Sequence, residues 1–290
     1  MTVGRVLAQA SSIPLLEREL LFAALLRKDR SYLLAHGEDV VQPRHVQAYL
    51  RLLLRRERGE PLAYLTGVQP FYGLDFLVNQ HVLIPRPETE WLVEQAHTAL
   101  HEHPEIRTII DLGTGSGAII IALWKSLPFN QRRLLSWCAT DVSAPALTVA
   151  RLNAKRHKTR IVRFLQADLL KPFMDRRNAD SLPLIAPILL LANLPYLTTD
   201  DYRATAASGK KKFEPKIALE AGQDGLRYYR RLVAQIAKMH GLTFHCLWEI
   251  DPCHSKKLLT LVQKTFPKSR PCVHKDFYGL ERYLTMDIER

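Results

Sequence analysis

The spacing of apolar residues differs between the two parts of the chain, and in the first part it predicts helices. Residues 14–57 carry apolar residues at the spacing of amphipathic helices, without the alternation of strands. Pro14 suits a first helical turn, and Pro43 begins another helical pattern that ends at Gly59. The apolar positions of these helices are Leu16, Leu20, Ala24, Leu33, Leu34, Val46, Tyr49, Leu50 and Leu53. We therefore predict a small helical N-terminal domain over residues 1–70.

A short stretch after the helical region has the composition of strands. Residues 71–84, FYGLDFLVNQHVLI, form two short apolar runs around a turn signal at Asn79. Residues 71–90 are therefore predicted to be a connecting β-hairpin.

From residue 108 onward, strand-like runs alternate with helical patterns, which is typical of a mostly parallel sheet with helices on both faces. The strand candidates are 108–112, 134–141, 160–167, 187–192, 243–250, 269–276 and 281–288. The last two are separated only by residues 277–280, too few for a crossover helix, so they must pair antiparallel. Residues 91–290 thus predict an α/β domain of the class I, Rossmann-like methyltransferase type, a seven-stranded, mostly parallel sheet with an antiparallel last strand.

The charge balance bears on the kind of partner. The chain has 41 lysine and arginine residues against 29 aspartate and glutamate residues, a formal net charge of +12. Such an excess favours an acidic or polyanionic partner, such as RNA or a protein linked to RNA. The basic residues are spread over several helices, and no arginine-rich arm accompanies them. The pattern allows contact with nucleic acid but does not require it.

Composition also indicates the compartment. No stretch approaches the ~18 uninterrupted apolar residues of a membrane span. The first twenty residues lack a signal-peptide core, because Arg5 and the charged residues 17–19 interrupt them. The four cysteines form no CxxC pair and no metal-ligating spacing. We expect a cytoplasmic protein with reduced thiols, no membrane contact and no metal.

The sequence DLGTGSGAI places three glycines directly after an apolar strand and before an apolar helix. Glycines there let the backbone turn tightly and expose the N–H groups of a helix N-terminus to a ligand. A nicotinamide-binding loop would need GxGxxG, an alternative that Ala118 leaves formally open. Asp111 favours S-adenosylmethionine instead, because the amino group of that cofactor needs a carboxylate. The predicted cofactor residues of this segment are Asp111, Gly113, Thr114, Gly115, Ser116 and Gly117.

Two further strand ends carry residues suited to the same cofactor. Asp141 ends the second strand, where a carboxylate can accept hydrogen bonds from two neighbouring ribose hydroxyls. Its alternative role is to cap the helix that follows. Asp168 and Leu169 end the third strand, where they could meet the edge and the face of adenine. In this order, the motifs predict an S-adenosylmethionine site.

The fourth strand ends in Asn193, Leu194, Pro195 and Tyr196. Pro195 holds Leu194 extended, so that the Leu194 carbonyl and the Asn193 amide oxygen form a pair of acceptors. Two acceptors suit a planar NH2 group, and Tyr196 can stack on the flat group that carries it. Such a nitrogen is a poor nucleophile, so catalysis consists mainly of aligning it, without a general base before attack. We predict that these four residues bind the substrate and are catalytic.

Four segments of the sequence resemble one known family. They are GEPLAYLTGVQPFYGLDFLVNQHVLIPRPETEWLVEQA (59–96), DLGTGSGAI (111–119), ANLPYL (192–197) and FEPKIALEAGQDGLRYYRRL (213–232). Together with DFYGLERYL (276–284), they resemble the peptide-chain release factor N5-glutamine methyltransferases, PrmC/HemK. RPETE and the EP…AL…G.DGL pattern separate this family from other amino-methylating enzymes.

The resemblance implies a cofactor, an acceptor and a domain plan. The family transfers a methyl group from S-adenosylmethionine to the side-chain amide nitrogen of the glutamine in the Gly-Gly-Gln loop of class 1 release factors. Carried over to this sequence, the resemblance implies that Asn193 contacts the cofactor as well as the glutamine. A helical N-terminal domain, here residues 1–70, precedes the methyltransferase domain. That domain adds surface without chemistry, so we expect it to recognise the release factor, the alternative being that it only caps the sheet.

The sequence departs from the family pattern at two places. The usual tetrapeptide is NPPY, and Leu194 replaces its first proline. Because the acceptor at that position is a backbone carbonyl, leucine can supply it. The strand that usually reads glutamate, apolar, glycine is here Glu249, Ile250, Asp251 and Pro252, which changes the expected turn.

Other functions share part of this pattern. NLPY also occurs in ribosomal RNA adenine dimethyltransferases, although those carry their extra domain after the catalytic one and lack RPETE. DNA adenine N6-methylation is a second alternative. A third is a catalytically silent protein that only binds a ribosomal partner, which the intact glycine loop and the intact Asn193, Pro195 and Tyr196 oppose.

Overall fold

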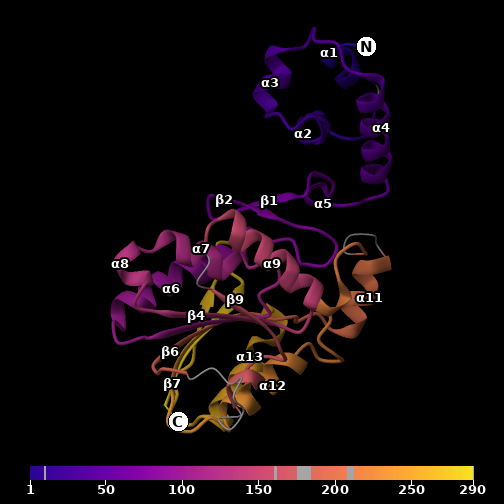
Figure 1. Cartoon of the computed structure of the whole chain (residues 1–290). Coiled ribbons are helices and arrows are strands. Elements are labelled where there is room, and N and C mark those ends of the chain that lie inside the picture. The colour runs from indigo at the N-terminus through magenta and orange to yellow at the C-terminus, as the bar shows by residue number, and fades with distance from the viewer. Residues whose placement is uncertain (10, 160–161, 175–183, 208–211, 290) are drawn as a thin grey trace. The chain divides into compact units, whose positions relative to one another are not determined.

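The computed structural model describes residues 1–9, 11–159, 162–174, 184–207 and 212–289 (Figure 1). The chain divides into two compact units, Met1–Val68 and Gln69–Arg290. Part of the predicted strand 160–167 lies outside the described residues, as do Lys210 and Lys211, two of three consecutive lysines in the sequence. Within the described residues, no helix combines the length and the apolar character needed to cross a membrane.

The N-terminal unit is helical, as predicted. Its helices are α1 (Val3–Leu7), α2 (Leu15–Leu26), α3 (Arg30–Ala35), α4 (Pro43–Glu57) and α5 (Leu62–Thr66). Pro43 is the first residue of α4, where its missing N–H costs nothing. Gly59 ends α4 at φ +89°, with its N–H on the Arg56 carbonyl and the Glu60 N–H on the Arg55 carbonyl. Pro14 instead lies just before α2, as its N-cap residue.

The apolar faces of this unit are only partly buried. Phe22 of α2 packs on Tyr49 of α4 with ring centroids 4.8 Å apart, and both are fully buried. α2 turns its Leu21–Ala23 side inward, so Leu16 remains 51% exposed on another side of the same helix. On α4, Leu50 is 40% exposed. The large apolar side chains exposed on this unit are Met1, Leu15, Leu16, Leu20, Leu34, Val40, Leu50 and Leu54.

The β-hairpin turns earlier than the sequence suggests. Its strands are β1 (Val68–Phe71) and β2 (Leu74–Leu77), so the predicted turn at Asn79 is wrong. The two residues between the strands, Tyr72 and Gly73, both have positive φ, as the tight two-residue turn of a hairpin requires. Asn79 lies beyond β2, where its side chain accepts a hydrogen bond from the His81 N–H at 3.0 Å. Asn79 is therefore a genuine turn residue, but of the next turn.

The C-terminal unit contains the predicted seven-stranded sheet, with the order β5-β4-β3-β6-β7-β9-β8. Its strands are β3 (Thr108–Leu112), β4 (Ser136–Asp141), β5 (Arg163–Gln166), β6 (Ile188–Asn193), β7 (Thr243–Glu249), β8 (Cys272–Lys275) and β9 (Glu281–Glu289). β3 pairs parallel with β4 and β6, and β6 with β7, whereas β9 runs antiparallel to both β7 and β8. This arrangement confirms the predicted class I methyltransferase fold.

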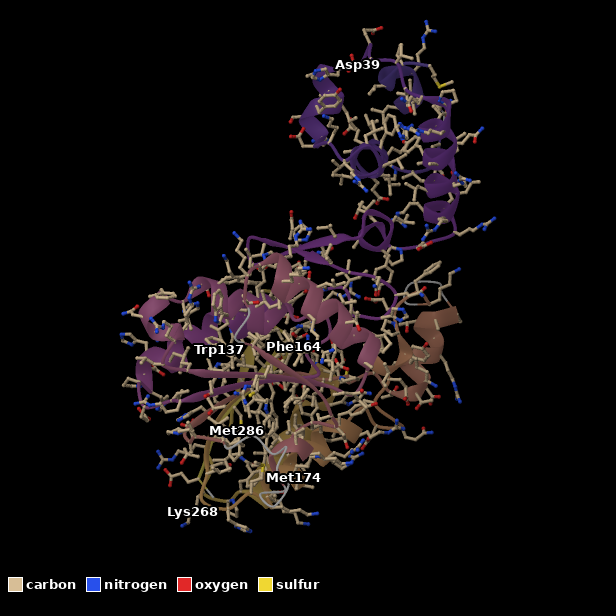
Figure 2. The ribbon with its side chains drawn as sticks, in the orientation of Figure 1. Asp39, Trp137, Phe164, Met174, Lys268 and Met286 are labelled. Carbon is tan, nitrogen blue, oxygen red and sulfur yellow. The ribbon has the colours of Figure 1, made fainter. Side chains whose placement is uncertain are left out.

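Helices cover both faces of this sheet (Figure 1). They are α6 (Glu90–Glu102), α7 (Ala118–Ser126), α8 (Phe129–Arg132), α9 (Ala144–Arg156), α10 (Lys171–Met174), α11 (Thr199–Ala207), α12 (Arg227–Ile236) and α13 (Ser255–Thr265), with short 3-10 turns at Pro87–Thr89, Lys216–Ala218 and Pro252–His254. Trp137 and Phe164 belong to the core under α6 and α7, whereas Met174 and Met286 belong to the core under α12 and α13 (Figure 2). Burial on both faces explains why the central strands are continuously apolar.

The order of the strands determines where a ligand can bind. From β3 the chain proceeds to β4 and β5 on one side, and it returns to β6 and β7 on the other side. Such a reversal opens a crevice at the carboxyl ends of the strands. Asp141, Asn193 and Glu249 are the last residues of their strands at this edge.

Candidate active site

The glycine loop connects β3 to α7 and adopts a conformation that only glycine takes easily. Gly113, Gly115 and Gly117 have φ values of +66°, +55° and +80°. A Cβ on Gly117 would lie 2.9 Å from the Ile121 side chain, and one on Gly113 would lie 3.1 Å from the Leu194 side chain. The loop therefore packs closely on both sides and leads directly into the N-terminus of α7, where backbone N–H groups can bind an anion.

Several predicted loop residues lie behind the loop rather than on its open side. The Asp111 carboxylate is fully buried and accepts a hydrogen bond from the Thr114 hydroxyl at 2.6 Å. Burial raises the pKa of Asp111 to about 7. The Ser116 carbonyl accepts a hydrogen bond at 2.9 Å from the buried Asn153 side chain, which also bonds to the backbone of Leu77. These contacts hold the loop in place from behind.

Asp141 connects the glycine loop to helix α9. One of its carboxylate oxygens accepts the Gly115 N–H at 2.9 Å, and the other accepts the Ser143 N–H at 2.8 Å. The N-cap of α9 is Ser143, whose side chain accepts the Ala146 N–H. Asp141 is therefore not the cap, the alternative that its position left open. Each carboxylate oxygen retains a second lone pair for a ligand hydroxyl.

The segment after β5 is held by helix α12. Arg231 and Lys171 both pair with the carboxylate of Asp168. The Gln235 side chain accepts the Leu170 N–H at 2.7 Å and donates to the Asp168 carbonyl at 3.3 Å. Leu169, between them, has a φ of +56°, which is rare for leucine and requires such support. Gln235 has no signal of its own in the sequence.

A chain of hydrogen bonds orients the amide of Asn193. Its Nδ2 donates to the Thr89 hydroxyl at 3.0 Å, and the Thr89 hydroxyl donates to the Glu249 carboxylate at 2.7 Å. Both Thr89 and Glu249 are buried, and burial raises the pKa of Glu249 to about 7. The NH2 group of Asn193 bonds to Thr89, and within the part of the chain that the structure describes no hydrogen bond engages its carbonyl oxygen, which can therefore act as an acceptor. Thr89 lies in RPETE, whose role at the site the sequence did not reveal.

Leu194 makes a contact that proline cannot make. Its N–H donates to the Tyr229 hydroxyl at 3.4 Å, and that hydroxyl donates to the Glu249 carbonyl. The Leu194 side chain is buried against Gly113. The loss of a rigid ring is thus partly compensated by a hydrogen bond that fixes the same backbone.

Two pockets meet at the end of β6. The larger one encloses about 690 Å³, part of which is open solvent. It is lined by His81, Val82, Leu83, Gly113, Gly115, Asp141, Val142, Ser143, Ala146, Ala167, Asp168, Leu169, Asn193, Leu194, Pro195, Ile217, Ala218 and Tyr228. The smaller pocket, about 350 Å³, is lined by Leu83, Arg86, Asn193, Leu194, Pro195, Tyr196, Leu197, Ala218, Leu219 and Glu249. Asn193 to Pro195 therefore form a wall shared by both pockets.

The pockets bring together most of the predicted site residues, but not all. Those lining the larger pocket are Gly113, Gly115, Asp141, Asp168, Leu169, Asn193, Leu194 and Pro195. Tyr196 lines the smaller pocket, and burial holds the pKa of its phenol well above its usual value. Asp111, Thr114, Ser116 and Gly117 line neither pocket.

Two segments of the sequence that surround the smaller pocket bind each other. Arg86 of RPETE forms a 2.6 Å ion pair with the buried Glu214 of the EP segment. The same Glu214 carboxylate accepts the Ile84 N–H at 3.2 Å. Gly225, in the same 213–232 segment as Glu214, lets the backbone lie close to Tyr196, since a Cβ at this position would be 2.4 Å from the Tyr196 carbonyl oxygen. These contacts explain why the two motifs accompany the Asn-Leu-Pro-Tyr turn.

The altered turn after β7 needs no glycine. Asp251 has a φ of −81°, and its side chain accepts the Cys253 N–H at 2.8 Å. Pro252 then begins a short 3-10 turn, a position that suits proline. The departure from the expected pattern is thus a different but regular turn.

Two known domain families match this chain. The PrmC N-terminal domain matches residues 3–67, and the Methyltransferase small domain matches residues 89–181. The first match lies in the helical unit, and the second includes the glycine loop, Asp141 and Asp168.

Relatives match over most of the chain. The release factor glutamine methyltransferase of Dictyoglomus turgidum is 34% identical over 93% of this chain and 89% of its own length. The enzyme of Nitratidesulfovibrio vulgaris is 32% identical over 97% of this chain and 90% of its own length. The enzyme of Geobacter sulfurreducens is 37% identical over 75% of this chain and 70% of its own length.

Solved structures support the fold alone. The hMettl16 catalytic domain in complex with MAT2A 3'UTR hairpin 1 has a TM-score of 0.54 at 14% identity, covering 92% of this chain and 90% of that one. The complex with hairpin 6 has a TM-score of 0.53 at 15% identity, covering 92% of each chain.

Proposed function

The chain belongs to the release factor glutamine methyltransferase family, and from this premise we propose which of its atoms carry the reaction. The enzyme transfers a methyl group from S-adenosylmethionine to the side-chain amide nitrogen of a glutamine in a peptide-chain release factor. The observation that carries our assignment is the wall of Asn193, Leu194 and Pro195 between two pockets. A methyl donor on one side and an acceptor amide on the other would meet at this wall.

The chemistry of its lining suits the larger pocket to S-adenosylmethionine. The backbone N–H groups at the N-terminus of α7, which follows the glycine loop, suit the carboxylate of the cofactor, and Asp141 suits its ribose hydroxyls. The backbone of Leu169, held by Gln235, suits the edge of adenine. We assign Asp111, Thr114 and Ser116 to supporting the loop instead of touching the cofactor. When bound, the cofactor supplies an electrophilic methyl group.

The smaller pocket fits a glutamine side chain, and two acceptors there would align its amide. The Asn193 carbonyl oxygen and the Leu194 carbonyl each accept one N–H of the NH2 group. The amide nitrogen gains positive character as it is methylated, and these two acceptors then bind it more strongly. Tyr196, which remains a neutral phenol, covers the planar face of the amide. After transfer, the methylated nitrogen loses one proton to water.

Recognition of the release factor needs surface beyond one glutamine. We assign it to the N-terminal unit, residues 1–70, because that unit exposes large apolar side chains on α2 and α4. Residues 71–90 then act as the connection to the methyltransferase domain, residues 91–290. A second contact is Phe277, 97% exposed on the turn between β8 and β9. That turn lies at the same edge of the sheet as Glu249, because Glu249 pairs with Tyr283 near the start of β9.

One assay with tritiated S-adenosylmethionine separates this function from the alternatives. Class 1 release factor, ribosomal RNA and DNA are offered separately, and we expect label in the release factor alone. Labelled adenine in RNA or DNA would contradict the assignment of the smaller pocket. We expect the reaction to take place in the cytoplasm, where release factors act on the ribosome.

A further inference from the structure

A second cluster of polar side chains lies at the opposite edge of the sheet from the pockets. His103, Glu105 and His245 each offer one ligating atom, and these three atoms lie within 4.8 Å of one another. The two imidazole rings are 4.0 Å apart between centroids. His245 precedes Glu249 by four residues of β7, so about 13 Å of strand separates the cluster from the active-site edge.

His245 is oriented so that one ring nitrogen remains available. It is 6% exposed, and its Nδ1 lies 2.7 Å from a carboxylate oxygen of Asp287 on β9. Its Nε2 is buried and has no hydrogen-bond partner among the described residues. When Nδ1 donates its proton to Asp287, Nε2 carries a lone pair without a proton. A buried ring nitrogen without a partner in the protein is a position that a water molecule or a metal ion can fill.

The other two side chains are held on one turn. His103 follows the last residue of α6, and its N–H donates to the Ala99 carbonyl at 2.8 Å. The Ile106 N–H donates to the His103 carbonyl at 3.1 Å, which closes a turn with Pro104 in its second position. His103 Nδ1 and the Glu105 carboxylate are already 3.4 Å apart. The turn thus presents an imidazole and a carboxylate together, beside His245.

We propose that His103, Glu105 and His245 bind a divalent transition metal, with Zn²⁺ as the preferred ion. Two imidazoles and one carboxylate are a donor set that zinc takes in proteins, with water in the fourth position. Ligands at zinc's usual distances lie about 3.3 Å from each other in a tetrahedron, so His103 and Glu105 need little movement. Imidazole disfavours Mg²⁺ and Ca²⁺, which prefer oxygen ligands.

Asp287 completes the proposed site without touching the metal. A carboxylate behind a ligating histidine fixes its tautomer and strengthens it as a ligand. The ion would tie the turn after α6 to strands β7 and β9, which are distant in the sequence. The site is separate from the methyltransferase pockets, so its role is to stabilise the domain, and its test does not depend on the proposed function.

The experiment measures zinc binding to the full chain after removal of metal with a chelator. Zn²⁺ alone is added, and bound metal is counted after dialysis together with the melting temperature. We expect one Zn²⁺ per chain and a melting temperature several degrees higher with zinc. His103→Ala and Glu105→Gln, both at partly or fully exposed positions, should each lower the affinity at least tenfold. His101→Ala, two residues upstream and exposed, is the matched control and should bind like wild type.

Replacement of zinc by Co²⁺ identifies the donor atoms. A site of nitrogen and oxygen ligands gives visible absorption without the strong near-ultraviolet band of a cobalt–thiolate bond. A thiolate band would assign the metal to Cys253 or Cys272, the exposed cysteines, and would overturn the proposal. Equal zinc affinity in wild type and His103→Ala would overturn it as well.

Discussion

Two clusters of polar side chains, one at each edge of the large sheet, differ in how fully the protein itself supplies their hydrogen-bond partners. At the carboxyl edge, Asn193, Thr89 and Glu249 form a continuous chain of hydrogen bonds, so each group has a partner within the protein. At the amino edge, His245 is equally well buried, yet one of its nitrogens has no such partner. In the first cluster the hydrogen bonds orient an atom for the substrate, whereas in the second the unpaired nitrogen of His245 is a ligand atom of the proposed metal site. The following experiments test each half of this contrast.

The largest expected effect concerns the burial of Glu249. Burial raises its pKa from the ordinary 4.5 to about 7, so the unfolded chain releases this proton first as the pH rises. Glu249 therefore destabilises the fold increasingly between pH 4.5 and 7, by about 3 kcal/mol at full ionisation. Glu249→Gln cannot ionise, so its free energy of unfolding relative to wild type should rise by that amount between pH 4.5 and 8. Urea unfolding at both pH values measures this difference in the free energy of unfolding. A difference that stays the same at both pH values would show that the pKa of Glu249 is not raised.

Asp141 tests the cofactor side of the carboxyl edge. Asp141→Ala removes a carboxylate assigned to the ribose hydroxyls, and a charged hydrogen bond contributes about 1.5–3 kcal/mol. We expect the dissociation constant for S-adenosylmethionine to rise by roughly ten- to hundredfold in calorimetry. Ser143→Ala removes the N-cap of α9, and the loss of melting temperature in that variant is the measure of damage to the helix alone. Unchanged affinity in Asp141→Ala would leave Asp141 with only its bonds to Gly115 and Ser143.

Thr89 tests whether a satisfied network positions the acceptor. Thr89→Val keeps the shape but removes the hydroxyl between Asn193 and Glu249. We expect kcat to fall by about tenfold with little change in cofactor affinity, since one buried hydrogen bond is lost. Thr89→Ser restores the hydroxyl and should restore kcat. If valine and serine behave alike, Thr89 does not position Asn193.

The smallest effect is expected on the surface of the N-terminal unit. Leu16→Asn with Leu50→Asn should raise KM for the intact release factor several-fold, because apolar contact area is lost. A short Gly-Gly-Gln peptide does not use that surface, so its kinetics should not change. Leu134→Asn, at an exposed leucine of the other unit, is the matched control. Equal losses with protein and peptide would contradict the recognition role of this unit.

The sequence could predict those features that depend on residues close to one another in the chain. The strands, the glycine loop and the Asn-Leu-Pro-Tyr turn depend on neighbouring residues, and the structure confirms the predicted seven-stranded, mostly parallel sheet with an antiparallel last strand. The predicted position of the hairpin turn, at Asn79, was wrong because two turns lie close together in the sequence. The hairpin turns at Tyr72 and Gly73, and Asn79 belongs to the turn that follows.

Partners that are distant in the sequence could not be found in this way. Thr89 is 104 residues from Asn193 and 160 residues from Glu249, so no local pattern connects the three. Likewise, nothing near Asp168 indicated that Arg231 would occupy its carboxylate. His103 and His245 lie in different elements, so a search for metal-ligand spacing could not pair them.

The central claim is that the Asn193 amide oxygen aligns the acceptor nitrogen at the wall between the two pockets. Its most direct test is mass spectrometry of a release factor methylated by wild type or by Asn193→Ala, with cofactor affinity measured on the same samples. We predict a single methyl group on the glutamine of the Gly-Gly-Gln loop, and a turnover lower by on the order of a hundredfold or more in the variant. Cofactor affinity should stay within a few-fold. Wild-type turnover in Asn193→Ala, or a methyl group on another residue, would contradict the account.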